Sequence, residues 1–160
     1  MTHSTRTRTL LVAGAVLVTA MAPAMAARAA APSRSDLTVV RLDPDPAPPG
    51  GGTTVHGFVA NNGPDTTANA FAVTIEMPPG ARAVGPFFPD NCQAGPLGHT
   101  VRCVFPAGLP QGRTATALIP ARISGLLGSG TVLTGGSVTV TGPDDTDPAN
   151  NRAPFTITVA

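Results

Sequence analysis

The sequence predicts an all-β fold, an antiparallel β-sandwich of seven or eight strands. Short segments in which apolar and polar residues alternate recur along the chain, as in strands with one buried face. Turn residues separate these segments, because 18 glycines and 18 prolines are spread through the 160 residues rather than gathered in one tract. No segment after residue 26 shows a helical period. These three observations together favour two packed sheets.

Residues 1–26 have the features of a secretory signal peptide. Arg6 and Arg8 form a positively charged start, and Leu10–Ala20 is an apolar run followed by small residues. The candidate cleavage positions are Ala26, Ala29 and Ala31. The apolar run is shorter than the roughly 20 residues that span a bilayer, so we expect a secreted, extracellular protein and no membrane span in the mature chain. The lack of a hydrophobic tail before Ala160 predicts release rather than anchoring.

The mature chain should consist of a flexible arm, residues 27–35, and one sandwich domain, residues 36–160. Alternation predicts strands at 36–43, 53–60, 69–77, 81–88, 100–105, 114–123, 131–141 and 154–159. Between the first two, Pro44–Gly52 holds four prolines and three glycines. Such a segment should not pair in a ladder, so it is expected to be a rigid crossing between sheets.

Several positions carry more specific expectations. The stretch Asn61–Asp65 should make a tight connection in which Asn and Gly adopt a positive φ. Pro120 faces outward in its strand, which suits an edge strand or a bulge, and Gly135–Gly136 suggests a bulge. The side chains of Phe87 and Phe88 are expected to fill one end of the core. Leu126 and Leu127 are expected to dip into it from a glycine-rich bend.

Cys92 and Cys103 are the only cysteines. Two cysteines in an exported chain most simply form one disulfide. Closing a loop of about ten residues would stabilise the fold by roughly 3 kcal/mol in the chain-entropy model. The alternative, a reactive pair, would favour close C-x-x-C spacing and a nearby base.

His56 and Phe58 form the candidate contact surface. In the strand 53–60, Val55, Gly57 and Val59 face inward, so His56 and Phe58 share the outward face. An outward Phe beside a His can be an interaction site. It can also be covered by a neighbouring loop, or be a single harmless apolar residue. The sequence leaves both interpretations open.

The acidic turn is the candidate metal site. Asp144, Asp145, Asp147 and Asn150 lie close together, and Ca²⁺ takes six to eight oxygen ligands. However, the spacing has neither the central Gly nor the closing Glu of an EF-hand. Asp and Asn also fill turns for their own local hydrogen bonds. The prediction is therefore no metal, with these residues as weak Ca²⁺ candidates.

The sequence predicts that the protein is not an enzyme and needs no cofactor. His56 and His99 show no zinc-ligand spacing, no nucleophile-elbow motif is present, and Glu76 is the only Glu. The stretch Gly50–Gly52 lacks the Lys of a phosphate loop. Without the two leader arginines the net charge is −1 and dispersed, which excludes the electrostatic footprint of a nucleic-acid binder.

Several motifs in order resemble one family, and the resemblance covers Asp36–Val159. They are an opening DLTV, the turn NNGP at 61–64, the strand-and-turn VTI…MPPG at 73–80, the Cys92/Cys103 pair, LPQG at 109–112 and the acidic lead DDTDPANN at 144–151. The chain resembles the domain of unknown function eleven, the immunoglobulin-like repeat domain of bacterial surface and secreted proteins. That resemblance implies an immunoglobulin-like fold outside the cell and brings no catalytic residues.

The expected function is that of a secreted, non-enzymatic module with a structural or protein–protein interaction role in the cell envelope or extracellular space. An unidentified protein partner is expected, at the strand edges or at the His56/Phe58 face. The alternative is a secreted carbohydrate- or ligand-binding module, most plausibly for a polysaccharide. Trp and Tyr, the usual sugar platforms, are absent.

Overall fold

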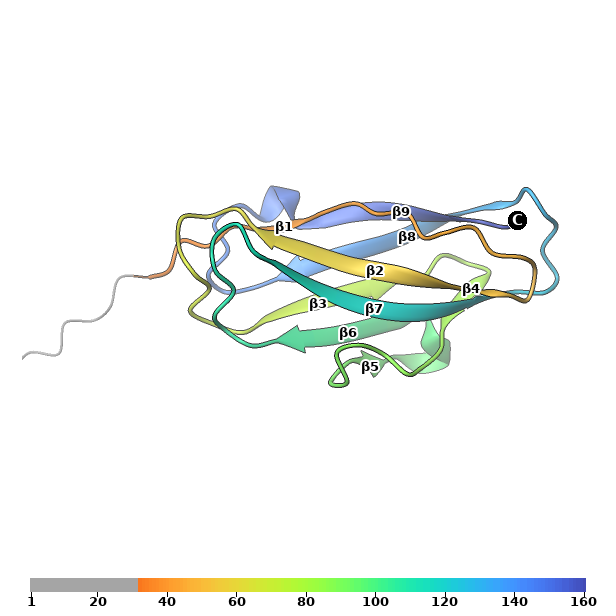
Figure 1. The fold of residues 1–160 in the computed structure, drawn as a ribbon, viewed down its shortest axis with the longest axis horizontal. Helices are drawn as coiled ribbons and strands as arrows, with labels where there is room; N and C mark the ends of the chain where they lie inside the picture. Colours follow the sequence, from red (N-terminus) through yellow and green to blue (C-terminus); the bar gives the residue numbers. More distant parts are fainter. Residues whose placement is uncertain (1–31) are drawn as a thin grey trace, which may run out of the picture. The chain divides into compact units, whose positions relative to one another are not determined.

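The computed structural model describes residues 32–160, which form two antiparallel sheets packed face to face (Figure 1). The strands are β1 Leu37–Val39, β2 Gly52–Asn61, β3 Phe71–Glu76, β4 Ala81–Ala83, β5 Gln93–Ala94, β6 Thr100–Phe105, β7 Thr114–Ile123, β8 Val132–Thr141 and β9 Arg152–Thr158. One sheet has four strands in the order β1-β2-β7-β4, and the other has five in the order β5-β6-β3-β8-β9. The predicted immunoglobulin-like β-sandwich is confirmed.

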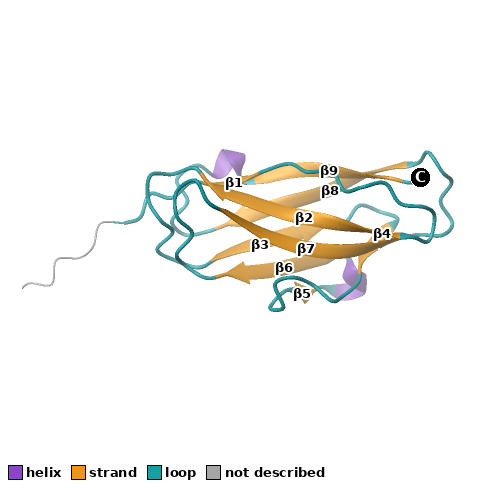
Figure 2. Cartoon of the chain, viewed as in Figure 1, coloured by secondary structure: helices purple, strands orange, loops and turns teal. Residues whose placement is uncertain are grey.

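The strand prediction erred by one element. The described residues hold nine strands rather than seven or eight, because β5 is only two residues long and shows no alternation. Two single-turn 3₁₀ helices, η1 Pro96–Gly98 and η2 Pro148–Asn150, lie in connections, and Figure 2 shows them as the only helical turns drawn. The predicted signal peptide 1–26, most of the arm 27–35 and the cleavage positions Ala26, Ala29 and Ala31 lie outside the described residues.

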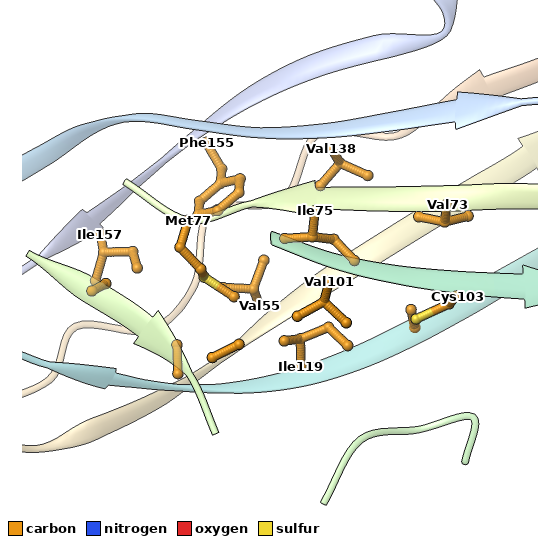
Figure 3. Close-up of a cluster of buried hydrophobic side chains, with 14 of the residues drawn as sticks. Val55, Val73, Ile75, Met77, Val101, Cys103, Ile119, Val138, Phe155 and Ile157 are labelled. Carbon is orange, nitrogen blue, oxygen red and sulfur yellow. The ribbon is translucent and has the colours of Figure 1, made fainter. Parts of the chain in front are cut away.

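The core is the set of inward side chains that the alternation predicts. On β3 the side chains of Val73 and Ile75 are fully buried, and on β7 those of Ala117 and Ile119 are fully buried. Figure 3 shows side chains of both sheets, among them Val55, Ile75, Val101, Ile119 and Phe155, meeting between the ribbons. With no Trp or Tyr, the core consists mainly of aliphatic side chains. At about 25 cal/mol per Å² of apolar surface, their burial is the main stabilising contribution to the fold.

The segment Pro44–Gly52 joins β1 to β2, which are neighbours in the same sheet, so the prediction of a crossing between sheets was wrong. The segment also pairs at one residue. The N–H of Ala47 donates to the carbonyl of Thr158 (3.1 Å), and the N–H of Ala160 donates to the carbonyl of Ala47 (2.9 Å). Ala47 lies between Pro46 and Pro48, and as a non-proline it keeps the N–H that such pairing needs. The chain thus leaves β1, covers part of the β9 edge of the five-stranded sheet, and returns to pair with β1 as β2.

The stretch Asn61–Asp65 joins β2 to β3 in different sheets, and it works differently from the prediction. None of Asn61, Asn62 and Gly63 has a positive φ. Instead the side chain of Asn61 is fully buried and forms hydrogen bonds with the backbone of Gly63 and Asp65 in the turn. Gly63 is needed for space, because a Cβ there would lie 2.5 Å from the carbonyl oxygen of Arg34 and from the amide nitrogen of Asp36.

Pro120 lies in an interior strand, so the prediction of an edge strand was wrong. β7 is hydrogen-bonded to β2 on one side and to β4 on the other. The N–H of Val84 donates to the carbonyl of Pro120 (2.9 Å), but proline has no N–H to donate in return. The β4 ladder ends at this point, so the missing donor falls where the partner strand stops.

The predicted bulge at Gly135–Gly136 is confirmed. The register of β8 against β9 shifts between Leu133 and Gly136, and Gly135 has a φ of +94°. For the glycine-rich bend after β7, only one of the two leucines predicted to enter the core does so. Leu127 packs against the core, whereas Leu126 is 98% exposed at the tip of the bend.

Residues 33–35, at the end of the segment predicted as a flexible arm, are hydrogen-bonded to the domain. The hydroxyl of Ser33 donates to the carbonyl of Thr66, and the hydroxyl of Ser35, a fully buried residue, donates to the carbonyl of Asp144. These bonds hold the chain directly before β1 against the β2–β3 connection and the acidic turn.

Candidate functional site

His56 and Phe58 lie on the outer face of the four-stranded sheet, as the alternation predicts. Their neighbours Val55, Gly57 and Val59 are buried, while both His56 and Phe58 are half-buried. Both side chains therefore keep part of their surface exposed.

The strand register places further apolar side chains beside this pair. Val40 lies opposite Phe58 and donates its N–H to the Phe58 carbonyl (2.9 Å). Leu118 on β7 is the register partner of His56, and Phe88 is in turn bridged to Leu118. Paired residues of an antiparallel sheet project from the same face, so these side chains form rows across the strands.

We call this surface the outer-sheet patch and define it as Val40, Leu42, His56, Phe58, Phe88 and Leu118. Three of its members are well exposed although apolar: Val40 at 41%, Leu42 at 48% and Phe88 at 59%. An exposed apolar group drawn from two strands and two connections is the kind of surface that marks a contact site. It offers shape and apolar area rather than reactive groups.

A cavity of about 650 Å³ borders the patch and is lined by Leu42, His56 and Leu118 together with Asp43 and Asp45. The N–H of Thr156 donates to the Asp43 carboxylate (2.8 Å), and Arg41 forms an ion pair with it (3.0 Å). These donors outweigh partial burial and hold the pKa of Asp43 below its ordinary value. On this side the patch is therefore bordered by polar groups, among them the Asp43–Arg41 ion pair.

Sequence reasoning found His56 and Phe58 but missed Leu42, Phe88 and Leu118. Phe88 was expected to plug the core with Phe87. Only Phe87 packs there, since Phe88 is held by reciprocal backbone bonds to Leu118 (3.1 and 2.8 Å) with its ring outward. The outward alternation of Leu118 was visible in the sequence, but the pairing that brings it to His56 was not.

The strand edges, the other predicted contact surface, are less available than the face. β4 and β5, at outer positions of the two sheets, are three and two residues long, and β9 is partly covered by Ala47. Short or covered edges are the usual protection against unwanted strand pairing. Of the two predicted contact surfaces, the outer-sheet patch is therefore the more accessible to a partner.

The Cys92–Cys103 disulfide is present, as predicted. Cys103 is fully buried on β6 and Cys92 is nearly so, at the end of the connection from β4. The bridge ties that connection to the five-stranded sheet. Oxidised and buried sulfurs serve structure rather than nucleophilic chemistry.

The carboxylates of the acidic turn are occupied by hydrogen bonds within the domain. Asp144 accepts from the N–H groups of Ala68 and Asn69 (both 2.7 Å) and from the Asn69 side chain (2.6 Å). Burial alone would raise the pKa of Asp144, but donation by Asn69 and Ala68 lowers it below its ordinary value. Asp144 therefore ties the acidic turn to the β2–β3 connection.

The remaining members of the acidic turn act in the same way. Asp145 accepts from the N–H of Leu37 (3.2 Å) and from the Asn151 side chain. Asp147 accepts from the N–H of Ala149 (3.1 Å) at the start of η2, and Asn150 donates to Asp36 (2.8 Å). Within residues 32–160 no group of three or more His, Cys, Asp and Glu side chains is arranged to hold a metal.

The two histidines considered as catalytic or zinc-binding groups are not brought together. His56 lies on β2 and lines the cavity beside the outer-sheet patch. His99 precedes β6 and lines a different cavity, beside β4 and the end of β7.

Over the described part of the chain, no helix is long and apolar enough to cross a membrane.

Comparison with known proteins supports the fold. No protein-family model matches the chain, and no curated protein sequence matches it either. Among solved structures, the chain is similar to a variant of BcpA, the major pilin subunit of Bacillus cereus, with a TM-score of 0.53 and 9% identity over 79% of this chain and 39% of the pilin chain. It thus matches less than half of the pilin's length.

Two weaker similarities concern proteins of different kinds. A cohesin from scaffoldin B of Acetivibrio cellulolyticus, solved with a mutant dockerin, gives a TM-score of 0.43 at 10% identity over 81% of this chain and all of that chain. AvmM, which catalyses macrocyclization in alchivemycin A biosynthesis, gives 0.37 at 11% identity over 80% of this chain and 90% of that chain. The pilin similarity and the sheet order establish an immunoglobulin-like β-sandwich.

Proposed function

We propose that this protein is a secreted, non-enzymatic immunoglobulin-like module that makes structural or protein–protein contacts in the cell envelope or extracellular space. The observation that carries the proposal is the outer-sheet patch, where Val40, Leu42 and Phe88 are well exposed on one sheet face. Interfaces are enriched in aromatic side chains at their centres and are bordered by polar groups. Asp43 and Asp45 provide such a border here.

Export is supported by two features of different origin. The charged start, apolar run and small-residue cleavage motif of residues 1–26 have the pattern of a signal peptide. The Cys92–Cys103 disulfide is independent of that pattern, and disulfides persist mainly in oxidising compartments such as the extracellular space. The resemblance to the domain of unknown function eleven belongs to the same proposal and implies the same location.

The absence of enzymatic activity is proposed from how the polar groups are used. His56 and His99 line separate cavities, and the carboxylates of Asp144 and Asp145 accept hydrogen bonds from the domain's own backbone. An acid–base mechanism needs a positioned pair of titratable groups within hydrogen-bond reach of a substrate. This arrangement of polar groups therefore favours a rigid contact module with an apolar face over an acid–base enzyme.

The contact role is tested by capture of partners with the mature protein. We expect the wild-type protein to enrich specific proteins from envelope and extracellular fractions of the producing cells. The double variant Leu42→Ser/Phe88→Ser should lose that enrichment. Both positions are about half exposed, so the core is not disturbed, and a circular dichroism spectrum checks the fold of each variant.

Leu126→Ser is the matched control. Leu126 is 98% exposed on the bend after β7 and is not a member of the outer-sheet patch. This variant should capture the same proteins as the wild type. Enrichment of nothing above background, or equal capture by all three proteins, would count against a contact function of the patch.

Export is tested separately by intact mass spectrometry of the culture medium. The expected product begins after Ala26, Ala29 or Ala31 and is lighter by two hydrogen masses than the reduced chain. Recovery of the unprocessed chain inside the cells, or of two free thiols in the processed chain, would contradict this part of the proposal.

A further inference from the structure

A second cavity, of about 520 Å³, lies at the end of the sandwich where several connections meet. It is lined by the end of β7, by β4, and by the connections that contain Gly50, Gly80, His99 and Ser124. Figure 1 shows β4 at the same end of the domain as the tip of the β7–β8 connection. The cavity lies apart from the outer-sheet patch, and its lining contains no acidic residue.

Two arginines face each other at this cavity. Arg82 on β4 and Arg122 on β7 are direct register partners, so their side chains project from the same face of the sheet. Like charges directly opposite each other in a sheet are destabilising. Nothing within the domain neutralises them, because the ion pairs formed among residues 32–160 use other arginines, namely Arg34, Arg41 and Arg152.

The position of Arg122 is set by the neighbouring backbone. One guanidinium nitrogen, Nη1, donates to the carbonyl of Gly50 (2.9 Å), and the cross-strand partner on β2 is Gly52, which has no side chain to cover it. The rest of the guanidinium retains its other N–H groups. A guanidinium presents several donors in a planar fork that matches the oxygens of a carboxylate or a phosphate.

An apolar wall completes the cavity. Leu97 lines it, is 81% exposed, and has a left-handed backbone with a φ of 57°, which is costly for a leucine. The close approach of the following residue to β4 keeps the backbone of Leu97 in this conformation. The next residue, Gly98, fits so closely against β4 that a Cβ would lie 2.6 Å from the carbonyl oxygen of Ala83. His99 follows directly as a further polar group in the lining.

We propose that this cavity binds an oxyanion, either a carboxylate or a phosphate monoester, attached to a short apolar group. The guanidinium groups of Arg82 and Arg122 bind the oxygens, and the apolar group lies against Leu97. Binding offsets the repulsion between the two arginines, which no side chain of the described domain relieves. This site is independent of the contact function proposed for the outer-sheet patch.

The test is a titration of the isotope-labelled mature chain followed by the amide resonances of the cavity in NMR spectra. The probes are butyrate, butyl phosphate and butylammonium. We expect saturable shifts at Arg82, Arg122 and Ser124 with at least one of the two anions and none with the cation. The anion that binds more tightly identifies the source as a carboxylate or a phosphate.

Variants assign the binding to the arginine pair. Arg82→Gln and Arg122→Gln should each weaken anion binding at least tenfold, and Arg122→Lys should weaken it less because it keeps the charge but loses the fork. The control is Arg113→Gln, at an exposed arginine outside the cavity lining, which should leave the affinity unchanged. These positions are exposed, and unshifted spectra of the free variants confirm their folding.

Three results would overturn the proposal. The first is no saturable shift at the cavity up to about 50 mM anion, beyond the millimolar range of weak specific binding. The second is equal weakening by Arg113→Gln, which would indicate general attraction to positive charge. The third is unchanged affinity in both glutamine variants of the cavity.

Discussion

Replacing Asn61, the last residue of β2, by Ala should strongly destabilise the domain. The Asn61 side chain is fully buried and makes four hydrogen bonds to backbone groups. Its Oδ1 accepts from the N–H groups of Asp36 and Gly63 (both 3.1 Å), and its Nδ2 donates to the carbonyls of Asp65 (2.8 Å) and Leu109 (2.9 Å). One side chain thus joins three separate segments of the chain.

The magnitude follows from these four bonds. A net contribution of about 1 kcal/mol for each of the four bonds gives a loss of about 4 kcal/mol, before any added cost for backbone groups left unpaired in a buried place. That is a large share of the total stability of about 5–15 kcal/mol that domains have. Asn62→Ala is the matched control, since Asn62 is exposed and its side chain makes one bond, to the hydroxyl of Thr38 (3.0 Å). Its loss should be below about 1 kcal/mol.

The measurement is urea unfolding followed by far-UV circular dichroism, because the chain has no Trp or Tyr for fluorescence. With a denaturant slope of about 1–3 kcal/mol per M, Asn61→Ala should lower the midpoint by about 1–4 M. A free energy of unfolding for Asn61→Ala within about 1 kcal/mol of that for Asn62→Ala would refute the reasoning. It would mean that water or a rearranged backbone replaces all four bonds.

Three other changes have expected outcomes. Gly136→Ala would place a Cβ 2.6 Å from the ring of Phe155, so thermal unfolding should show a loss of about 1–3 kcal/mol. Gly128→Ala, where no atom lies within 4 Å, should show none, and equal effects would contradict the steric argument. Replacing both Cys92 and Cys103 by Ala should cost roughly 3 kcal/mol in denaturant unfolding; an unchanged midpoint would mean that the bridge does not restrict the unfolded chain. The pKa of Asp144 is lower in the folded chain than the ordinary 3.8, so its stabilising effect is complete above that pH and is lost as the pH falls through the folded pKa. Asp144→Asn should therefore lower the melting temperature at pH 7 and flatten its decline in acid, and parallel pH profiles for the two proteins would contradict this.

The inward and outward positions of most strands could be predicted because alternation is a local property. Val73 and Ile75 are buried, and His56 and Phe58 are on an outer face, for the same reason: successive side chains of a strand point to opposite sides. The bulge at Gly135–Gly136 was likewise predictable, since paired glycines interrupt an otherwise regular strand.

The candidate sites needed the pairing of strands that are distant in sequence. Leu118 reaches His56, and Arg122 reaches Arg82, only through the register of β7 with β2 and β4. Phe88 looked like a core residue in the sequence, and the backbone bonds to Leu118 turn its ring outward. No local pattern records which residues of two strands lie opposite each other.

The sequence by itself determined the fold class, the buried face of each main strand and the pairing of the only two cysteines. All three depend on residue types and on spacings of a few residues along the chain. The tertiary structure decided the role of Asn61, the pairing of Ala47 with β9, the composition of the outer-sheet patch and the juxtaposition of Arg82 and Arg122. Each of these joins residues brought together by sheet register and by the packing of two sheets, which are properties of the whole domain.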